Sequence, residues 1–244
     1  ADRLGAEKIA TGHYARVGRD ASGAPFLREG KDRNKDQSYF LFATRREEIE
    51  RLVFPLGESD KREVREEAIA RKLPGAHKGE SQELCFVGAG AGAYASFVEE
   101  RAKDRIRPGP ILDSDGRVVG AHEGIHRFTI GQRKGIGVAL GKPAFVAAID
   151  SETATVRLGG EDDLLAAGAR LEDVVLAPGV TLPREARVRV RYRHDGEAAH
   201  VDAHGNVRFL TAVRAVSRGQ IAVFYDGDRV LGGGRIADAV SSST

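Results

Sequence analysis

The 244-residue sequence contains no methionine, no tryptophan and a single cysteine, Cys85. One cysteine cannot form an internal disulfide, which favours a reducing, cytoplasmic setting. The sequence has no apolar run near the roughly 18 residues that a membrane span requires, so we expect no membrane partner. The formal charge of +2 is close to zero. Any affinity for nucleic acid must therefore come from local basic patches.

The missing methionine also bears on the first segment, ADRLGAEKIATGHYARV. A chain without methionine does not begin where translation begins: it lacks either a single initiator residue or a whole upstream segment, and the pattern of this opening favours the second. The segment predicts the end of a helix, a turn at Gly5 and a buried strand from Ile9. We therefore expect that an upstream segment, with part of the sheet, is absent from this sequence.

Three regions differ in pattern. Residues 1–87 mix strands with helices, including a capped, charged helix ended by Pro-Gly in SDKREVREEAIARKLPG. Residues 88–150 begin with GAGAGA and continue through a short helix into Gly-rich short strands. Residues 151–240 hold strand-length pieces at short intervals, such as TATVRLG and QIAVFY, which predict a small β-barrel or sandwich. The expected fold class is α/β followed by β.

The stretch RVRVRYR, residues 187–193, alternates basic and apolar residues. In a strand this alternation puts four arginines on one face: Arg187, Arg189, Arg191 and Arg193. Four guanidinium groups on one face repel one another unless anions lie opposite. The partner could be a polyphosphate backbone. Alternatively, the segment could be a solvated edge strand whose charges prevent aggregation.

Other motifs have ordinary explanations. HEGIH, residues 122–126, has the letters of a zinc-protease motif, but the central glycine and strand-like flanks argue against the helix that such a site needs, so we expect no metal site. GVALGKP is one residue short of a phosphate-binding loop. KDRNKDQSYFLF reads as a charged loop entering a buried element, and FTIGQRKGIG as a tight basic turn or an exposed loop.

Cys85 lies in SQELCFV, between a polar and an apolar run. Free cysteines are usually buried and behave as small hydrophobic residues. Reactivity depends on exposure and on thiolate character, neither of which the local sequence reveals. The pattern alone leaves both alternatives open.

Taken together, these stretches resemble a known family in their order and spacing. The segments IATGHYARV, KDQSYFL, FPLGESDKREVREEA, SQELCFV, DSDGRVVGAHEGIHRFTIGQRKGIG, RVRYR and RGQIAVFYDGDRVLGGGRI are similar to motifs of the bacterial tRNA-specific 2-thiouridylases. The resemblance implies an ATP-pyrophosphatase-type α/β domain (here 1–87), a small central domain (88–150) and a C-terminal β-barrel (151–240) that binds tRNA.

The resemblance also implies a reaction. Members adenylate the 2-carbonyl oxygen of the wobble uridine with Mg-dependent ATP and replace that oxygen with sulfur. The sulfur is carried as a persulfide on the cysteine that matches Cys85. The donor would be a relay protein or a cysteine desulfurase directly.

Matching positions imply further roles. Gly12 corresponds to a backbone contact with ATP, and His13 to a tRNA contact. The other implied tRNA contacts are Lys35, Asp36 and Gln37 near the anticodon, Arg191 and Tyr192 in the basic strand, and Gln220.

Two family features do not occur in the 244 residues: the Ser-Gly-Gly-x-Asp-Ser pyrophosphate loop and a first catalytic cysteine. We therefore expect the C-terminal two-thirds of a thiouridylase, inactive by itself. The alternative is a stand-alone tRNA-binding or sulfur-carrier module without uridine-activating activity.

Overall fold

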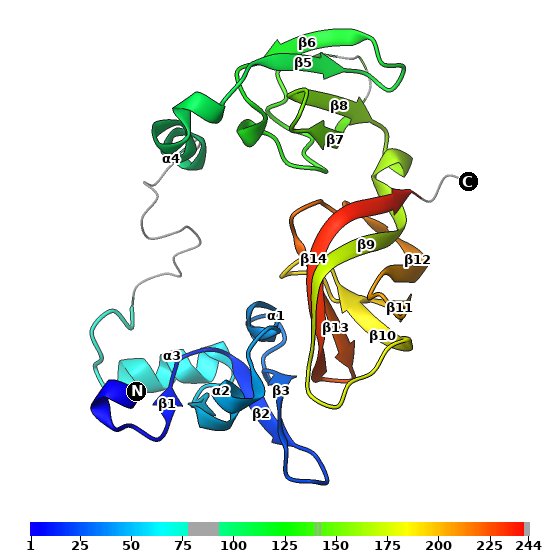
Figure 1. Ribbon diagram of the computed structural model, residues 1–244. Helices are drawn as coiled ribbons and strands as arrows, with labels where there is room; N and C mark the ends of the chain where they lie inside the picture. Colours follow the sequence, from blue (N-terminus) through cyan, green and yellow to red (C-terminus); the bar gives the residue numbers. More distant parts are fainter. Residues whose placement is uncertain (78–92, 140, 142, 242–244) are drawn as a thin grey trace. The chain divides into compact units, whose positions relative to one another are not determined.

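The structure is a computed structural model that describes residues 1–77, 93–139, 141 and 143–241 (Figure 1). The chain forms two compact units. Among the described residues, unit 1 combines 1–77 with 167–212 and 217–241, and unit 2 comprises those between 93 and 166 together with 213–216. The carboxyl-terminal barrel thus packs with the amino-terminal segment.

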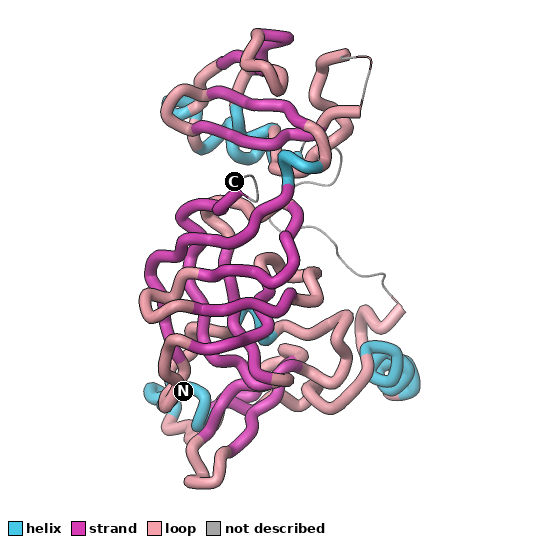
Figure 2. The backbone as a smooth tube through the Cα atoms, turned by 90° about the vertical axis from the view of Figure 1, so that its right-hand side faces the viewer, coloured by secondary structure: helices cyan, strands magenta, loops and turns pink. Residues whose placement is uncertain are grey.

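Unit 1 contains a closed, six-stranded barrel, visible as the crossing magenta strands of Figure 2. Its strands follow the order β13-β10-β11-β12-β9-β14, and the pairing of β13 with β14 closes it. The strand bounds are β9 Leu165–Leu176, β10 Arg184–Arg189, β11 Glu197–Val201, β12 Val207–Arg214, β13 Ile221–Asp226 and β14 Arg229–Ser241.

The amino-terminal part of unit 1 is a small α/β segment. A parallel pair, β1 with β4, lies beside the antiparallel hairpin of β2 and β3. The elements are η1 Asp2–Leu4, β1 Ile9–Ala10, β2 Ala15–Arg19, β3 Pro25–Glu29, α1 Ser38–Leu41, α2 Arg46–Arg51, β4 Leu52–Val53 and α3 Lys61–Ala70. A capping box of Asp60 and Glu63 starts α3, which confirms the capped helix expected there.

The hairpin extends the barrel sheet, because β3 pairs with β14 at Arg28 and Arg229. A shared hydrophobic cluster then joins residues of both parts, among them Leu27 and Tyr39 with Val223. Gly233 makes room for this contact. A Cβ there would lie 2.4 Å from the Ala222 carbonyl oxygen and 2.9 Å from the Phe42 ring.

Unit 2 is built on a four-stranded sheet of order β6-β5-β8-β7, in which β5 and β8 run parallel. Its core contains Ile111, Val146, Val156 and Leu158. The elements are α4 Ala93–Arg101, η2 Lys103–Arg105, β5 Gly109–Leu112, β6 Val118–His122, η3 Ile125–Arg127, β7 Phe145–Asp150, β8 Thr155–Gly159 and η4 Asp162–Leu164.

The expected fold class is confirmed: an α/β segment, a small domain of short strands and a β-barrel. Two details differ from the sequence analysis. Ile9 is 43% exposed rather than buried, because β1 and β4 form only a two-residue pair. The expected boundary at residue 150 falls between β7 and β8, which are hydrogen-bonded neighbours in one sheet. None of the described helices is long and apolar enough to cross a membrane.

Candidate functional site

The strand β10 does not present four arginines to solvent. It ends at Arg189, so Arg191 and Arg193 lie in the following turn. It is not an edge strand either, because it pairs with β11 on one side and β13 on the other. Both alternatives drawn from the alternating pattern are therefore wrong for Arg187 and Arg189, whose charges are met by carboxylates inside the protein.

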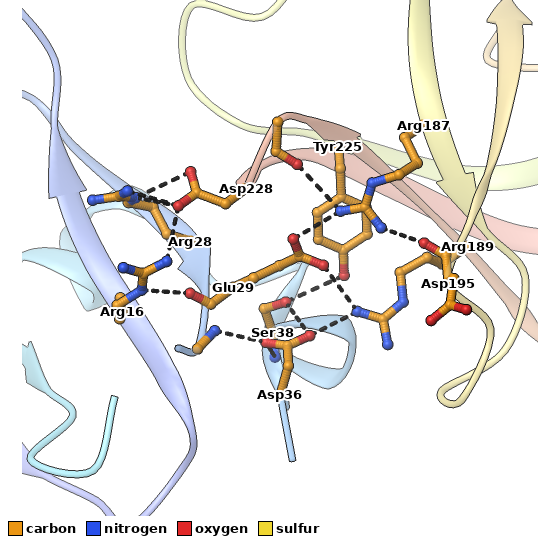
Figure 3. A network of polar contacts seen from close by, with 12 residues as sticks. Arg16, Arg28, Glu29, Asp36, Ser38, Arg187, Arg189, Asp195, Tyr225 and Asp228 are labelled. Carbon is orange, nitrogen blue, oxygen red and sulfur yellow. Dashed lines mark hydrogen bonds and ion pairs between the residues drawn. The ribbon is translucent and has the colours of Figure 1, made fainter. Parts of the chain in front are cut away.

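Arg189 is the centre of a buried ion-pair cluster (Figure 3). Its Nη1 donates to Asp36 Oδ2 at 2.7 Å and to Glu29 Oε1 at 3.3 Å. Its Nη2 donates to the main-chain carbonyl of Tyr192. Arg189 is 5% exposed, Asp36 1% and Glu29 4%. One side chain therefore fixes both the loop before α1 and the turn after β10.

Arg187 completes the cluster from the same face of β10. Its Nη2 lies 2.8 Å from Glu29 Oε2, and its guanidinium also donates to the carbonyls of Asp195 and Gly227. The guanidinium carbon stacks 4.6 Å from the centre of the Tyr225 ring (Figure 3). Burial raises the pKa of the Tyr225 phenol, so it stays neutral beside the acids.

The three consecutive candidates Lys35, Asp36 and Gln37 have different environments. Asp36 Oδ1 accepts hydrogen bonds from the main-chain nitrogens of Gly30 and Ser38, both at 3.0 Å, and Oδ2 accepts from Ser38 Oγ at 2.9 Å. Lys35 is half-buried, and its main-chain nitrogen closes a turn in the loop. The carboxylate of Asp36 thus faces the protein.

Gln37 and His13 lie on neighbouring segments. Gln37 Oε1 accepts a hydrogen bond from the main-chain nitrogen of Tyr14 at 3.0 Å, and the main-chain nitrogen of Gln37 donates to the Tyr14 carbonyl at 2.8 Å. The His13 ring bonds to Thr11 Oγ1 at 2.7 Å. The loop 35–37 is therefore held against the segment that carries His13.

Gly12 is exposed, and its backbone does not need glycine. A Cβ at this position would make only an ordinary 3.8 Å contact with Leu56. The missing side chain therefore leaves open space in front of the main chain, which allows a ligand to approach it closely.

The remaining tRNA-contact candidates lie at one end of the barrel, after the last residue of β10 and before the first residue of β13. Tyr192 and Ile221 both pack against the hydrophobic cluster that contains Tyr39, and the Tyr39 hydroxyl donates to the Ile221 carbonyl at 2.8 Å. Gln220 immediately precedes β13. The guanidinium of Arg191 has no hydrogen-bonding or ion-pair partner among the described residues.

Sequence reasoning missed Glu29 and Tyr225 as partners of the arginines, and Ser38 as a partner of Asp36. One signal was available: in PFLRE, alternation places Glu29 on the same face as buried Leu27. A carboxylate on the apolar face of a strand requires a cationic or hydrogen-bonding partner. The identity of that partner, 160 positions away in Arg189, could not be read from the sequence.

Two other motifs have no part in this cluster. In HEGIH, His122 Nε2 bonds to the Ala154 carbonyl at 3.0 Å, whereas His126 Nε2 bonds to Glu99 at 2.9 Å. The two imidazoles thus have separate partners, and no α-helix carries them. Cys85 lies outside the described residues.

Three family models match the chain in succession. Residues 1–89 match the tRNA methyl transferase HUP domain, 95–160 the tRNA methyl transferase PRC-barrel domain, and 172–236 the Aminomethyltransferase beta-barrel domain. Together these matches cover both units.

Curated relatives share a more specific name. The tRNA-specific 2-thiouridylase MnmA of Sorangium cellulosum (strain So ce56) is 56% identical over 251 residues, covering 99% of this chain and 64% of that protein. The proteins of that name from Geotalea uraniireducens (strain Rf4) and Moorella thermoacetica (strain ATCC 39073 / JCM 9320) are 43% and 46% identical, covering 99% and 96% of this chain and 65% and 67% of their own lengths. The chain thus spans about two-thirds of the length of these relatives. These matches confirm the resemblance found in the motifs, and the chain belongs to the tRNA-specific 2-thiouridylase family.

Proposed function

We propose that the protein takes part in ATP-dependent 2-thiolation of the wobble uridine of tRNA, and that unit 1 carries much of the tRNA-binding surface. The observation that carries this proposal is the clamp made by Arg189. It bonds Asp36, in the middle of one candidate tRNA-contacting segment, and the carbonyl of Tyr192, in another. Two segments that are far apart in sequence are thereby held in one fixed arrangement, as recognition of a folded RNA loop requires.

Charge supports an RNA partner at the turn after β10. Arg193 is exposed and Arg191 is half-buried, and neither guanidinium has a hydrogen-bonding or ion-pair partner among the described residues. Guanidinium groups pair well with phosphate oxygens, because their planar fork matches the geometry of two acceptors. We therefore assign phosphate contact to Arg191, with Tyr192, His13, Lys35, Gln37 and Gln220 as further tRNA contacts.

Asp36 receives a different role. Its carboxylate is buried, accepts three hydrogen bonds from Gly30 and Ser38, and pairs with Arg189. A carboxylate in this position would also repel phosphate. We propose that Asp36 fixes the main chain between Lys35 and Gln37, so that its neighbours rather than its own side chain contact tRNA.

ATP is proposed to approach the main chain at Gly12, where the exposed glycine leaves open space. ATP supplies the adenylate that makes the uridine oxygen a leaving group. The 244 residues do not contain the pyrophosphate loop of the family. We therefore expect that, without further residues, they bind tRNA but do not thiolate it.

Cys85 is proposed as the persulfide carrier. The outer sulfur of the Cys85 persulfide would attack C2 of the adenylated uridine, and AMP would depart with the original oxygen. A second thiol would then attack the Cys85 sulfur, which leaves the outer sulfur on the uridine and forms a disulfide. The sulfur donor is a relay protein or a cysteine desulfurase, and we propose that the reaction takes place in the cytoplasm.

The test uses the complete gene product, tRNA, ATP and a labelled sulfur donor, and measures transfer of label to tRNA. Cys85→Ser should abolish transfer while tRNA affinity stays within twofold. Retained transfer would remove Cys85 from the reaction. Specific tRNA binding without any transfer by the unsubstituted protein would instead favour a binding module.

A further inference from the structure

An exposed aromatic side chain interrupts the apolar run of α1. The sequence SYFLF predicts burial, and Tyr39 is indeed buried, yet Phe40 is 60% exposed. Full burial of a phenylalanine side chain contributes about 1.5–3 kcal/mol, and a side chain that is 60% exposed forgoes much of this free energy. The four-residue helix could not bury both neighbouring rings on one side, so its geometry determines which ring remains outside.

Phe40 does not stand alone. Its ring centre lies 4.7 Å from that of Tyr192, with an interplanar angle of 37°, and 5.4 Å from Tyr39 in an edge-on arrangement. Phe40 and Tyr192 come from segments about 150 positions apart and form one aromatic surface, which we call the Phe40–Tyr192 pair. The two rings are tilted toward each other, and with Phe40 60% exposed much of its ring remains accessible to a further flat group.

The pair is held by buried groups behind it. The Tyr39 hydroxyl bonds to the Ile221 carbonyl, which fixes α1 on the barrel. The Tyr192 carbonyl accepts from Arg189, which is itself paired with Asp36. The rings are therefore preorganised, so binding a ligand there costs little ordering of side chains.

Two basic side chains, Lys35 and Arg193, lie near Tyr192, in addition to Arg189, whose charge is already paired with Asp36 and Glu29. Burial and Asp36 raise the pKa of the Tyr192 phenol, whereas the nearby cations Lys35, Arg189 and Arg193 partly offset the increase. An aromatic face flanked by cations suits a nucleobase and its phosphates: the base stacks on the ring, and the phosphates meet the cations. A second copy of the chain is disfavoured at this face, because it would present the same cations.

We propose that the open face of Phe40, supported by Tyr192, stacks against an unpaired base of the bound RNA loop. This inference rests on the proposed tRNA binding and adds a contact that no motif assigned. Stacking is tolerant of base identity. The platform therefore contributes affinity and places the loop, while sequence discrimination belongs to other residues.

The experiment measures binding of the 244-residue chain to a tRNA anticodon stem-loop by fluorescence anisotropy. Phe40→Ala should weaken binding about 5- to 150-fold, the equivalent of the 1–3 kcal/mol found for one base stacked on an aromatic ring. Phe40→Trp should retain or improve affinity. Phe40→Leu should weaken binding almost as much as Phe40→Ala, because leucine has no aromatic face on which a base can stack. Leu210→Ala is the matched control, because Leu210 is an apolar residue of the barrel with a similar exposure, 67% against 60% for Phe40.

A set of stem-loops with one abasic nucleotide each identifies the stacked base. At one loop position the abasic RNA should bind more weakly, and Phe40→Ala should then cost nothing further. The slope of log K against log salt should not change with Phe40→Ala, because no charge is lost.

The outcomes separate the two proposals. RNA binding that is unaffected by Phe40→Ala would overturn the platform and leave tRNA binding intact. Absence of RNA binding by the unsubstituted chain would overturn both. If Phe40→Ala instead abolished self-association measured by sedimentation, with RNA affinity unchanged, the face would be an interface between copies, and the base-stacking proposal would fail.

Discussion

Replacing Arg189 with methionine should destabilise unit 1 by about 3–5 kcal/mol at pH 7, the range measured when one partner of a buried ion pair is removed. The substitution keeps an unbranched apolar stem and removes the charge that faces Asp36 and Glu29. Both carboxylates would remain buried. The lower end of the range is expected, because Asp36 keeps its three other hydrogen bonds and Glu29 keeps Arg187.

The measurement is urea unfolding followed by far-UV circular dichroism, since the chain has no tryptophan. Hydrogen exchange of peptides from each unit distinguishes a loss in unit 1 from one in unit 2. Arg184→Met is the matched control on the same strand. Arg184 pairs with Asp226 at 3.0 Å on the surface, where such pairs contribute about 0–1 kcal/mol.

Equal effects of the two substitutions would refute the reasoning, because they would mean that water reaches the Arg189 cluster. The double variant Arg189→Met with Asp36→Asn gives a second check. Removing the orphaned charge should recover part of the stability. Strictly additive losses would show that Arg189 and Asp36 are not energetically coupled.

Three further outcomes are expected. Arg191→Ala should weaken tRNA binding and lower the slope of log K against log salt by about 0.7–1, and an unchanged slope would exclude a phosphate contact. Burial, together with Arg191, lowers the pKa of His194 below 6.5. The contribution of His194 to stability is therefore complete above pH 6.5 and is lost as pH falls through the folded pKa. His194→Gln should make the free energy of unfolding in urea depend less on pH over this range. Gly233→Ala should cost about 1–3 kcal/mol by overpacking against Ala222 and Phe42, and a thermal midpoint equal to that of the unsubstituted chain would contradict the tight contact.

Local sequence patterns predicted the helices and strands better than they predicted the tertiary contacts of those elements. The capped helix α3 and the barrel strands follow from nearest-neighbour signals, such as the capping box at Asp60 and period-two alternation. Alternation also placed Arg187 and Arg189 on one face correctly. It could not show what that face meets, because Glu29 and Asp36 are brought there by packing of segments more than 150 positions apart.

The exposure of Phe40 illustrates the same limit. Composition favours burial of a phenylalanine in an apolar run. The outcome depends on a four-residue helix that can direct only some of its side chains into the barrel wall, and on Tyr192 arriving from a distant turn. Ile9 shows the converse. It does lie in a strand, β1, but β1 and β4 pair over only two residues each, which is too few to bury its side chain.

The division of unit 1 between the two ends of the chain has a consequence for synthesis on the ribosome. Asp36 emerges 153 positions before Arg189, with most of unit 2 translated in between. At about 5–20 residues per second, that gap lasts roughly 8–30 s. Throughout it, Asp36 and Glu29 lack the guanidinium of Arg189, and the hydrophobic surface around Tyr39 has no barrel to cover it. The nascent amino-terminal segment therefore cannot complete its native contacts during this interval. Unit 2 has time to fold first, although it lies in the middle of the chain.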